Sequence, residues 1–322
     1  MFELQHAPPS ARGMSNVPYL PDSVSRPHRN LLIVTAVMTA VLITLGGVVC
    51  ATRASGGCPD WPRCHGRLVP PPNVDSILEY SHRVAAMLTG ILVIASAVVG
   101  WLAKHSGTAL RIIPTIAAIL TGVVAVFGAF AVLTGLPPIL AAIDLGTAIV
   151  VLTLVITAAV VASLSRAEVG VRAARPAQSG VARLAVVTAV TLFTVIVSGV
   201  FVARGSVMRC IGGPMHIGTW ASIVCPGWLH TPRQILAGAV LALAAALVVA
   251  AVRNRRVDPV TRKWSVAFGT FLAIEILHGA VMVSFGPTTT LLIASAAVTT
   301  AAWSALVVVA VRAHLASSDE PR

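Results

Sequence analysis

Long apolar segments, each of roughly 20 residues or more, recur along the 322-residue chain. A helix of about 20 apolar residues crosses the hydrocarbon core of a bilayer, which is about 30 Å thick. The chain is 57% hydrophobic and 11% charged, whereas soluble domains carry about a quarter charged residues. This favours an all-α polytopic membrane protein over a soluble helical protein with an unusually apolar core. Eight transmembrane helices are expected, at 31–52, 79–103, 110–133, 138–164, 182–203, 232–252, 264–284 and 288–312.

The distribution of Lys and Arg predicts how these spans are oriented. Segments on one side of the expected membrane carry 16 of these residues and segments on the other side carry 6, with Arg83 left out because it lies inside a span. Basic residues accumulate on the cytoplasmic side, so both termini are expected in the cytoplasm of a plasma-membrane protein. The net charge of +12 is explained by this topology, because the basic residues lie between apolar spans and form no nucleic-acid-binding face.

The cysteines fit the same topology. Two long loops on the non-cytoplasmic side contain one pair each, Cys58 with Cys64 and Cys210 with Cys225. Thiols outside the cytoplasm are generally oxidised, so both pairs are expected to form disulfides. Cys50, at the end of the first span, is expected to remain a free thiol.

An internal repeat is suggested by matching positions in the two halves. His82 and His230 each enter a helix after a long loop, and each is followed eight residues later by a glycine. Four spans followed by four spans in the same orientation predict two tandem four-helix bundles related by a parallel repeat. The expected order is a cytoplasmic tail (1–30), a first bundle (31–165), a cytoplasmic linker (166–181), a second bundle (182–312) and a cytoplasmic tail (313–322).

Ionisable residues inside the expected spans are the candidate functional residues, because charge is costly at membrane depth. Glu79 and His82 lie three residues apart in EYSHR and share a helix face. They form either an interfacial cap that starts the helix or a ligand with a nearby carboxylate. The other candidates, all in or beside spans, are Asp144, His230, Glu275 and His278.

Heme is the cofactor that these histidines favour. Isolated histidines on different helices of a four-helix bundle can supply axial ligands to heme in an apolar slot. Zinc is disfavoured because the Cys58, Cys64 and His65 spacing fits neither a zinc knuckle nor covalent heme attachment.

Two sequence runs are distinctive, GGVVCATRASGGCPDWPRCHGRLVP (46–70) and EYSHR (79–83). Together they resemble the heme A synthase family. Members of that family are eight-helix membrane enzymes that oxidise the C8 methyl group of heme O to the formyl group of heme A for terminal oxidases. The eight spans, the two bundles and the paired loop cysteines extend the resemblance over about 30–312.

The resemblance implies roles for particular residues. Glu79 matches the carboxylate beside the substrate heme, and His82 matches one of the histidines that face this heme. Cys58 and Cys64 match the outer-loop cysteine pair. His230 matches a histidine of the second bundle, where the family holds a heme b cofactor. The implied partners are heme O, heme O synthase, cytochrome oxidase assembly factors and membrane lipid.

The chain departs from the family pattern in both bundles. Asp144 stands in the fourth span where the family has a second histidine, and it either ligates iron weakly or handles protons. The eighth span has no histidine in 291–300. His278 is therefore either a displaced ligand or a core histidine satisfied by Glu275. The alternative functions are a non-catalytic membrane heme-binding or assembly protein of the same family, and a transporter.

Overall fold

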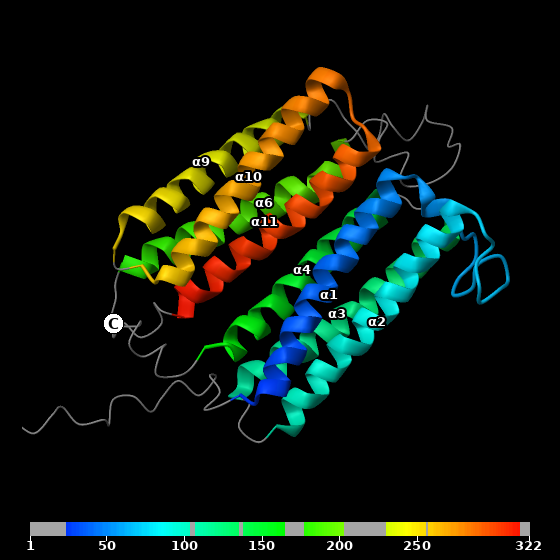
Figure 1. The fold of residues 1–322 in the computed structure, drawn as a ribbon, viewed down its shortest axis with the longest axis horizontal. Helices are drawn as coiled ribbons and strands as arrows, with labels where there is room; N and C mark the ends of the chain where they lie inside the picture. Colours follow the sequence, from blue (N-terminus) through cyan, green and yellow to red (C-terminus); the bar gives the residue numbers. More distant parts are fainter. Residues whose placement is uncertain are drawn as a thin grey trace, which may run out of the picture.

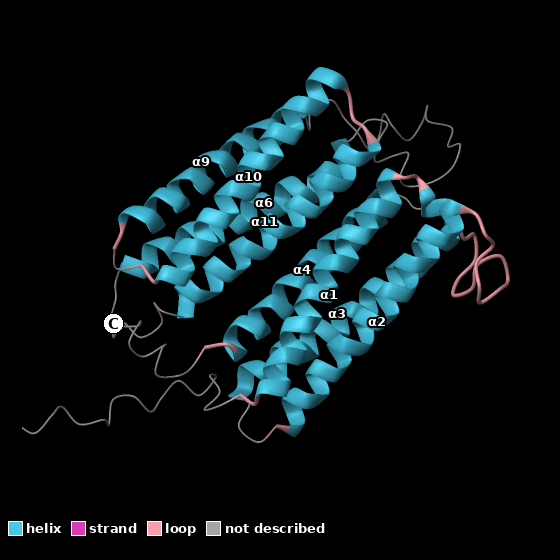
Figure 2. Cartoon of the chain, viewed as in Figure 1, coloured by secondary structure: helices cyan, strands magenta, loops and turns pink. Residues whose placement is uncertain are grey.

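The described fold is entirely helical (Figure 2). The computed structural model describes residues 24–103, 107–134, 138–164, 177–202, 230–255 and 257–315. Eight of its helices are long and apolar enough to cross a membrane, which confirms the predicted fold class. They are α1 (Arg26–Ala51), α2 (Val74–Leu102), α3 (Gly107–Thr134), α4 (Pro138–Ala162), α6 (Ala177–Val202), α9 (His230–Arg253), α10 (Pro259–Phe285) and α11 (Thr289–Leu315), with a short 3-10 helix η2 (Ala54–Gly56) after α1.

Several helices begin about one turn before the apolar runs that predicted them, because polar residues cap their first turns. The Asn73 side chain accepts a hydrogen bond from the Ser76 backbone N–H at 2.8 Å and starts α2. The Asp258 carboxylate accepts from Thr261 in the same way and starts α10. Glu79 therefore lies in the second turn of α2, and the interpretation of Glu79 as a cap that starts the helix is wrong.

The helices pack as two rings of four (Figure 1). Helices α1, α2, α3 and α4 contact one another in cyclic order, and α6, α9, α10 and α11 do the same. These rings are called the first and second bundle below. Their common arrangement agrees with a tandem repeat, although the repeat itself stays a prediction. Most of the expected tails and of the linker 166–181 lie outside the described residues.

The two bundles meet along α1 and α4 of the first and α6 and α11 of the second. Gly47 of α1 allows close approach there, since a Cβ at this position would lie 2.4 Å from the Cβ of Ala296 on α11. Further along the same interface, Trp303 Nε1 donates a hydrogen bond to Thr153 Oγ1 at 3.0 Å. Small residues and interhelical hydrogen bonds are the usual means of holding membrane helices together.

Polar contacts also join α1 to α2 inside the first bundle. The hydroxyls of Thr35 and Ser96 lie 2.9 Å apart and are buried. Each hydroxyl is also within hydrogen-bond distance of the Leu92 carbonyl oxygen. These bonds satisfy polar groups that would otherwise be costly away from water.

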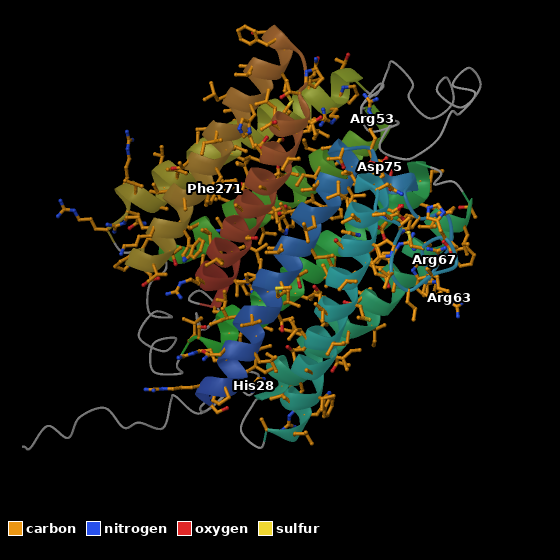
Figure 3. All side chains as sticks on the ribbon, turned by 45° about the vertical axis from the view of Figure 1, so that its right-hand side comes forward. His28, Arg53, Arg63, Arg67, Asp75 and Phe271 are labelled. Carbon is orange, nitrogen blue, oxygen red and sulfur yellow. A yellow bond between two sulfur atoms is a disulfide. The ribbon has the colours of Figure 1, made fainter. Side chains whose placement is uncertain are left out.

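The segment between α1 and α2 projects from one end of the molecule, which we call the loop end. Figure 3 shows Arg53, Arg63, Arg67 and Asp75 at the loop end, whereas His28 lies at the opposite end of α1. The turn between α10 and α11 also lies at the loop end (Figure 1). The candidate site residues described next come mainly from this half of the molecule.

Candidate functional site

The loop between α1 and α2 is closed by a disulfide between Cys58 and Cys64, as the sequence predicted, with a Cα–Cα distance of 4.7 Å. Both cysteines are buried. The Asp60 carboxylate accepts hydrogen bonds from the backbone N–H groups of His65 at 2.6 Å and Gly66 at 2.7 Å. The hydrogen bond from Gly66, followed by that from His65, holds the pKa of the Asp60 carboxyl below its usual range. The CPDWPRCHG string thus encodes a compact, internally bonded loop.

Gly57 places this loop directly on the first turn of α2. Its carbonyl oxygen accepts a hydrogen bond from the Ser76 hydroxyl at 2.5 Å. A Cβ at Gly57 would lie 2.4 Å from the carbonyl carbon of Asp75, so only glycine permits this approach. The loop is consequently fixed over the α2 segment that carries Glu79.

Glu79 is 5% exposed and both of its carboxylate oxygens are engaged. Oε2 accepts a hydrogen bond from the Cys58 backbone N–H at 2.9 Å, and Oε1 forms an ion pair with Arg83, one turn further along α2. Arg83 in turn donates to the backbone carbonyl oxygens of Asp60 at 2.6 Å, Arg63 at 2.9 Å and Cys58 at 2.9 Å. We call this arrangement of Glu79, Arg83 and the loop backbone the loop clamp.

Arg83 is the site residue whose role the sequence reasoning missed. The i, i+4 spacing of Glu79 and Arg83 was a sufficient signal for their pairing, because such residues are neighbours on a helix surface. The chemical consequence is that Glu79 is an acceptor with a fixed orientation and a cation beside it.

His82 lies beside the loop clamp and points toward α1. A Cβ at Gly46 would lie 3.3 Å from His82 Nε2, so the small glycine lets the imidazole pack closely against α1. No hydrogen bond to either ring nitrogen is formed within the described part of the chain. An imidazole without a hydrogen-bond partner can serve as an axial heme ligand.

Asp144 lies on α4, which is diagonal to α2 in the first bundle. Its Oδ1 atom is buried and has no hydrogen-bond partner among the described residues. This atom therefore makes no hydrogen bond to His82. Because α2 and α4 are diagonal, both helices border the interior of the first bundle, which is where cofactors bind in four-helix bundles. An orphaned carboxylate oxygen fits a site completed by a ligand.

Glu275 and His278 lie near one another on α10, as their spacing predicted. Glu275 Oε2 accepts a hydrogen bond from the Ser295 hydroxyl of α11 at 2.9 Å. Its other oxygen lies 3.8 Å from His278 Nδ1, which is too far for a hydrogen bond. His278 Nδ1 is buried without a hydrogen-bond partner in the described segments, so Glu275 does not satisfy it, and its role as a ligand stays a prediction.

Other expected residues lie outside the described parts. His230 is the first residue of α9, but its side chain is not described, and the Cys210–Cys225 pair falls in the stretch between α6 and α9 that is also outside the described residues. The expectation of a free thiol at Cys50 is wrong, because Cys50 is disulfide-bonded. The described residues hold no group of three His, Cys, Asp or Glu side chains placed around one metal ion.

The chain is similar to proteins of known name over most of its length. A protein-family model described as COX15-CtaA, cytochrome oxidase assembly protein, matches residues 29–307. Two proteins named heme A synthase are similar to the chain. One, from Exiguobacterium sp. (strain ATCC BAA-1283 / AT1b), is 28% identical over 80% of this chain and 83% of its own. The other, from Exiguobacterium sibiricum, is 26% identical over 81% of this chain and 88% of its own.

A third relative is similar over a shorter stretch. It is named protoheme IX farnesyltransferase, comes from Halobacterium salinarum, and is 35% identical over 28% of this chain and 20% of its own. The family match, by contrast, includes both sequence runs that suggested the site, together with most of α1 and α11 and the whole of every long helix between them. The chain therefore belongs to the COX15-CtaA family of cytochrome oxidase assembly proteins.

Proposed function

We propose that the protein oxidises the C8 methyl group of heme O to the formyl group of heme A. The observation that carries this proposal is the loop clamp, in which the buried Glu79 carboxylate is fixed three residues from His82. The two relatives named heme A synthase support the same reaction. The relative named protoheme IX farnesyltransferase supports a farnesylated heme as the substrate, with heme O synthase as the supplying partner and cytochrome oxidase assembly factors as further partners.

In this proposal the substrate heme lies inside the first bundle. His82 would bind its iron from the α2 side, and Asp144 would face it from α4. Histidine fixes the porphyrin plane, so the methyl group to be oxidised is held in one position relative to Glu79. Such positioning lowers the barrier by removing the freedom of the reacting groups.

Glu79 acts through its charge. The overall change removes four electrons from the methyl carbon, passing through an alcohol and a gem-diol that loses water, and dioxygen or another electron acceptor is required as a co-substrate. Positive charge that develops at this carbon is stabilised by a fixed carboxylate in a site shielded from water. Because Arg83 and the Cys58 N–H hold both oxygens of Glu79, the carboxylate needs no reorganisation during the reaction.

A heme b cofactor in the second bundle would be held by His230 and His278. Heme b supplies one-electron redox chemistry when bound. The orphaned Nδ1 of His278 supports this placement. The excess of basic residues at one side further supports a plasma-membrane location with both termini in the cytoplasm.

The test is production of heme A in cells that also express a heme O synthase, with extracted hemes separated by chromatography. The wild-type chain should give heme A. Glu79→Gln should give heme O alone, while the control Asp75→Asn, which changes an exposed carboxylate in the first turn of α2, should still give heme A. Equal amounts of heme A from the wild-type chain and Glu79→Gln would contradict the role of Glu79.

The alternative is a non-catalytic heme-binding or assembly protein. It is favoured by Asp144, which stands where the family has a histidine, because a carboxylate binds heme iron weakly. In that case the purified wild-type chain would retain heme and show Soret absorbance, yet no heme A would form in the same cells.

A further inference from the structure

Arg233 is a half-buried cation that the proposed reaction does not use. It lies in the first turn of α9, near the loop end, and its guanidinium is turned toward α6. A Cβ at Gly199 of α6 would lie 3.2 Å from Arg233 Nη2, so the glycine leaves space for the guanidinium. The Nε atom of Arg233 is buried and makes no hydrogen bond within the described segments.

An arginine in this position requires an explanation. Charged side chains near the end of a membrane helix usually extend to the polar headgroup region, but this one lies between two helices. No ion pair to Arg233 is formed by the described residues. Glu275, on the neighbouring helix α10, is already bonded to Ser295 and lies near His278.

An anion supplied from outside the described residues would complete this site. Guanidinium is planar and donates two parallel hydrogen bonds to a carboxylate or a phosphate, which makes such pairs stronger than neutral ones. Two sources of this chemistry reach the site: a porphyrin carries two carboxylate side chains, and a phospholipid carries a phosphate. The porphyrin is favoured because the guanidinium lies against Gly199 of α6 and its Nε atom is buried.

We propose that Arg233 binds a carboxylate of a porphyrin held in the second bundle. The inference rests on the proposed function insofar as a porphyrin occupies the second bundle. It adds that Arg233 holds one propionate of this porphyrin at the loop end. Gly199 has no side chain to occupy the space that the guanidinium fills.

The test compares two porphyrins that differ only in charge. The full chain is produced under heme limitation, purified, and titrated with heme and with heme dimethyl ester, whose propionates are esterified. Arg233→Gln should weaken heme binding by about tenfold to a hundredfold, the range expected for loss of a charge-assisted hydrogen bond. Binding of the dimethyl ester should be the same in wild type and variant. Arg253→Gln, which changes an exposed arginine at the other end of α9, should behave as wild type with both ligands.

Each other outcome overturns the inference. Equal heme affinity in wild type and Arg233→Gln would show that Arg233 does not bind a propionate. Equal weakening of heme binding and ester binding would indicate that Arg233 has a structural role. Lipid is tested by extracting the phospholipids that copurify from membranes rich in phosphatidylglycerol. Loss of phosphatidylglycerol from Arg233→Gln with unchanged heme affinity would identify a lipid phosphate as the partner. Heme binding that behaves as expected in a chain that makes no heme A would refute the proposed function alone.

Discussion

Replacing Arg83 by glutamine tests whether the loop clamp holds Glu79 in place. The substitution removes the ion pair to Glu79 and the bonds to three backbone carbonyl oxygens, at 2.6, 2.9 and 2.9 Å. The paired side chains of Arg83 and Glu79 are only 13% and 7% exposed, so solvent screens their attraction little. Glu79 would keep only the N–H of Cys58 as a partner.

The magnitude follows from the burial of the pair. Breaking a buried ion pair by removing one partner costs about 3–5 kcal/mol, because the remaining charge is left buried. The lower end applies here, since the Cys58 N–H still bonds to Glu79. At about 1.4 kcal/mol per factor of ten, a cost of about 3 kcal/mol increases the opening of the loop about a hundredfold.

Hydrogen exchange of the Cys58 backbone amide measures this opening, because that N–H is protected by its bond to Glu79. Exchange should be about a hundredfold faster in Arg83→Gln. Arg67→Gln is the matched control, as Arg67 is an exposed arginine of the same loop. Combining Arg83→Gln with Glu79→Gln should accelerate exchange less than the two single effects added, because no buried charge is left unpaired. Equal exchange in Arg83→Gln and Arg67→Gln would refute the clamp.

Three further predictions concern backbone approach and pH. Gly57→Ala should lower the free energy of unfolding of the loop by about 1–3 kcal/mol because its Cβ would clash with the start of α2. The control Gly56→Ala, whose Cβ would meet nothing within 4 Å, should leave this free energy unchanged. Hydrogen exchange of the loop amides measures both effects. The lowered pKa of Asp60 stabilises the loop above its unfolded pKa of about 3.9, and this stabilisation should be lost as the pH falls through the lower folded pKa. The protection of the loop amides, taken relative to their intrinsic exchange at each pH, should therefore be greater at about pH 5 than at about pH 2, and Asp60→Asn should remove this difference. Gly47→Ala should lower the thermal unfolding temperature in detergent because its Cβ would force α1 away from α11. The control is Gly122→Ala, where a Cβ meets nothing within 4 Å. An equal effect of both substitutions would show that helix packing at the bundle interface is not the cause.

The eight helices could be predicted from the sequence because a bilayer requires long apolar segments and internally bonded backbone. Their first residues could not, since apolar content does not mark the polar caps. Asn73 and Asp258 start α2 and α10 well before the apolar runs, and this is why Glu79 was expected at a helix start.

The candidate site was predictable in composition and only partly in geometry. Glu79 and the Cys58–Cys64 bond could be located from the motif. The bonds from Arg83 to the loop could not, because they end on backbone carbonyl oxygens, which leave no side-chain pattern in a sequence. Cys50 was misjudged for a related reason: pairing of cysteines depends on which segments meet in space, and Cys50 is disulfide-bonded.

The ion pair, disulfide and hydrogen bonds that link the first two helices and their loop have a consequence for biosynthesis. The loop clamp, the Cys58–Cys64 bond and the contact between Thr35 and Ser96 all join residues of α1, α2 and the loop between them. Contacts between residues close in sequence form early, because little chain must be ordered to close them. The α1–α2 hairpin can therefore insert, oxidise and fix Glu79 while the ribosome is still adding the later helices. The α2 side of the proposed heme site would then be formed before the second bundle exists.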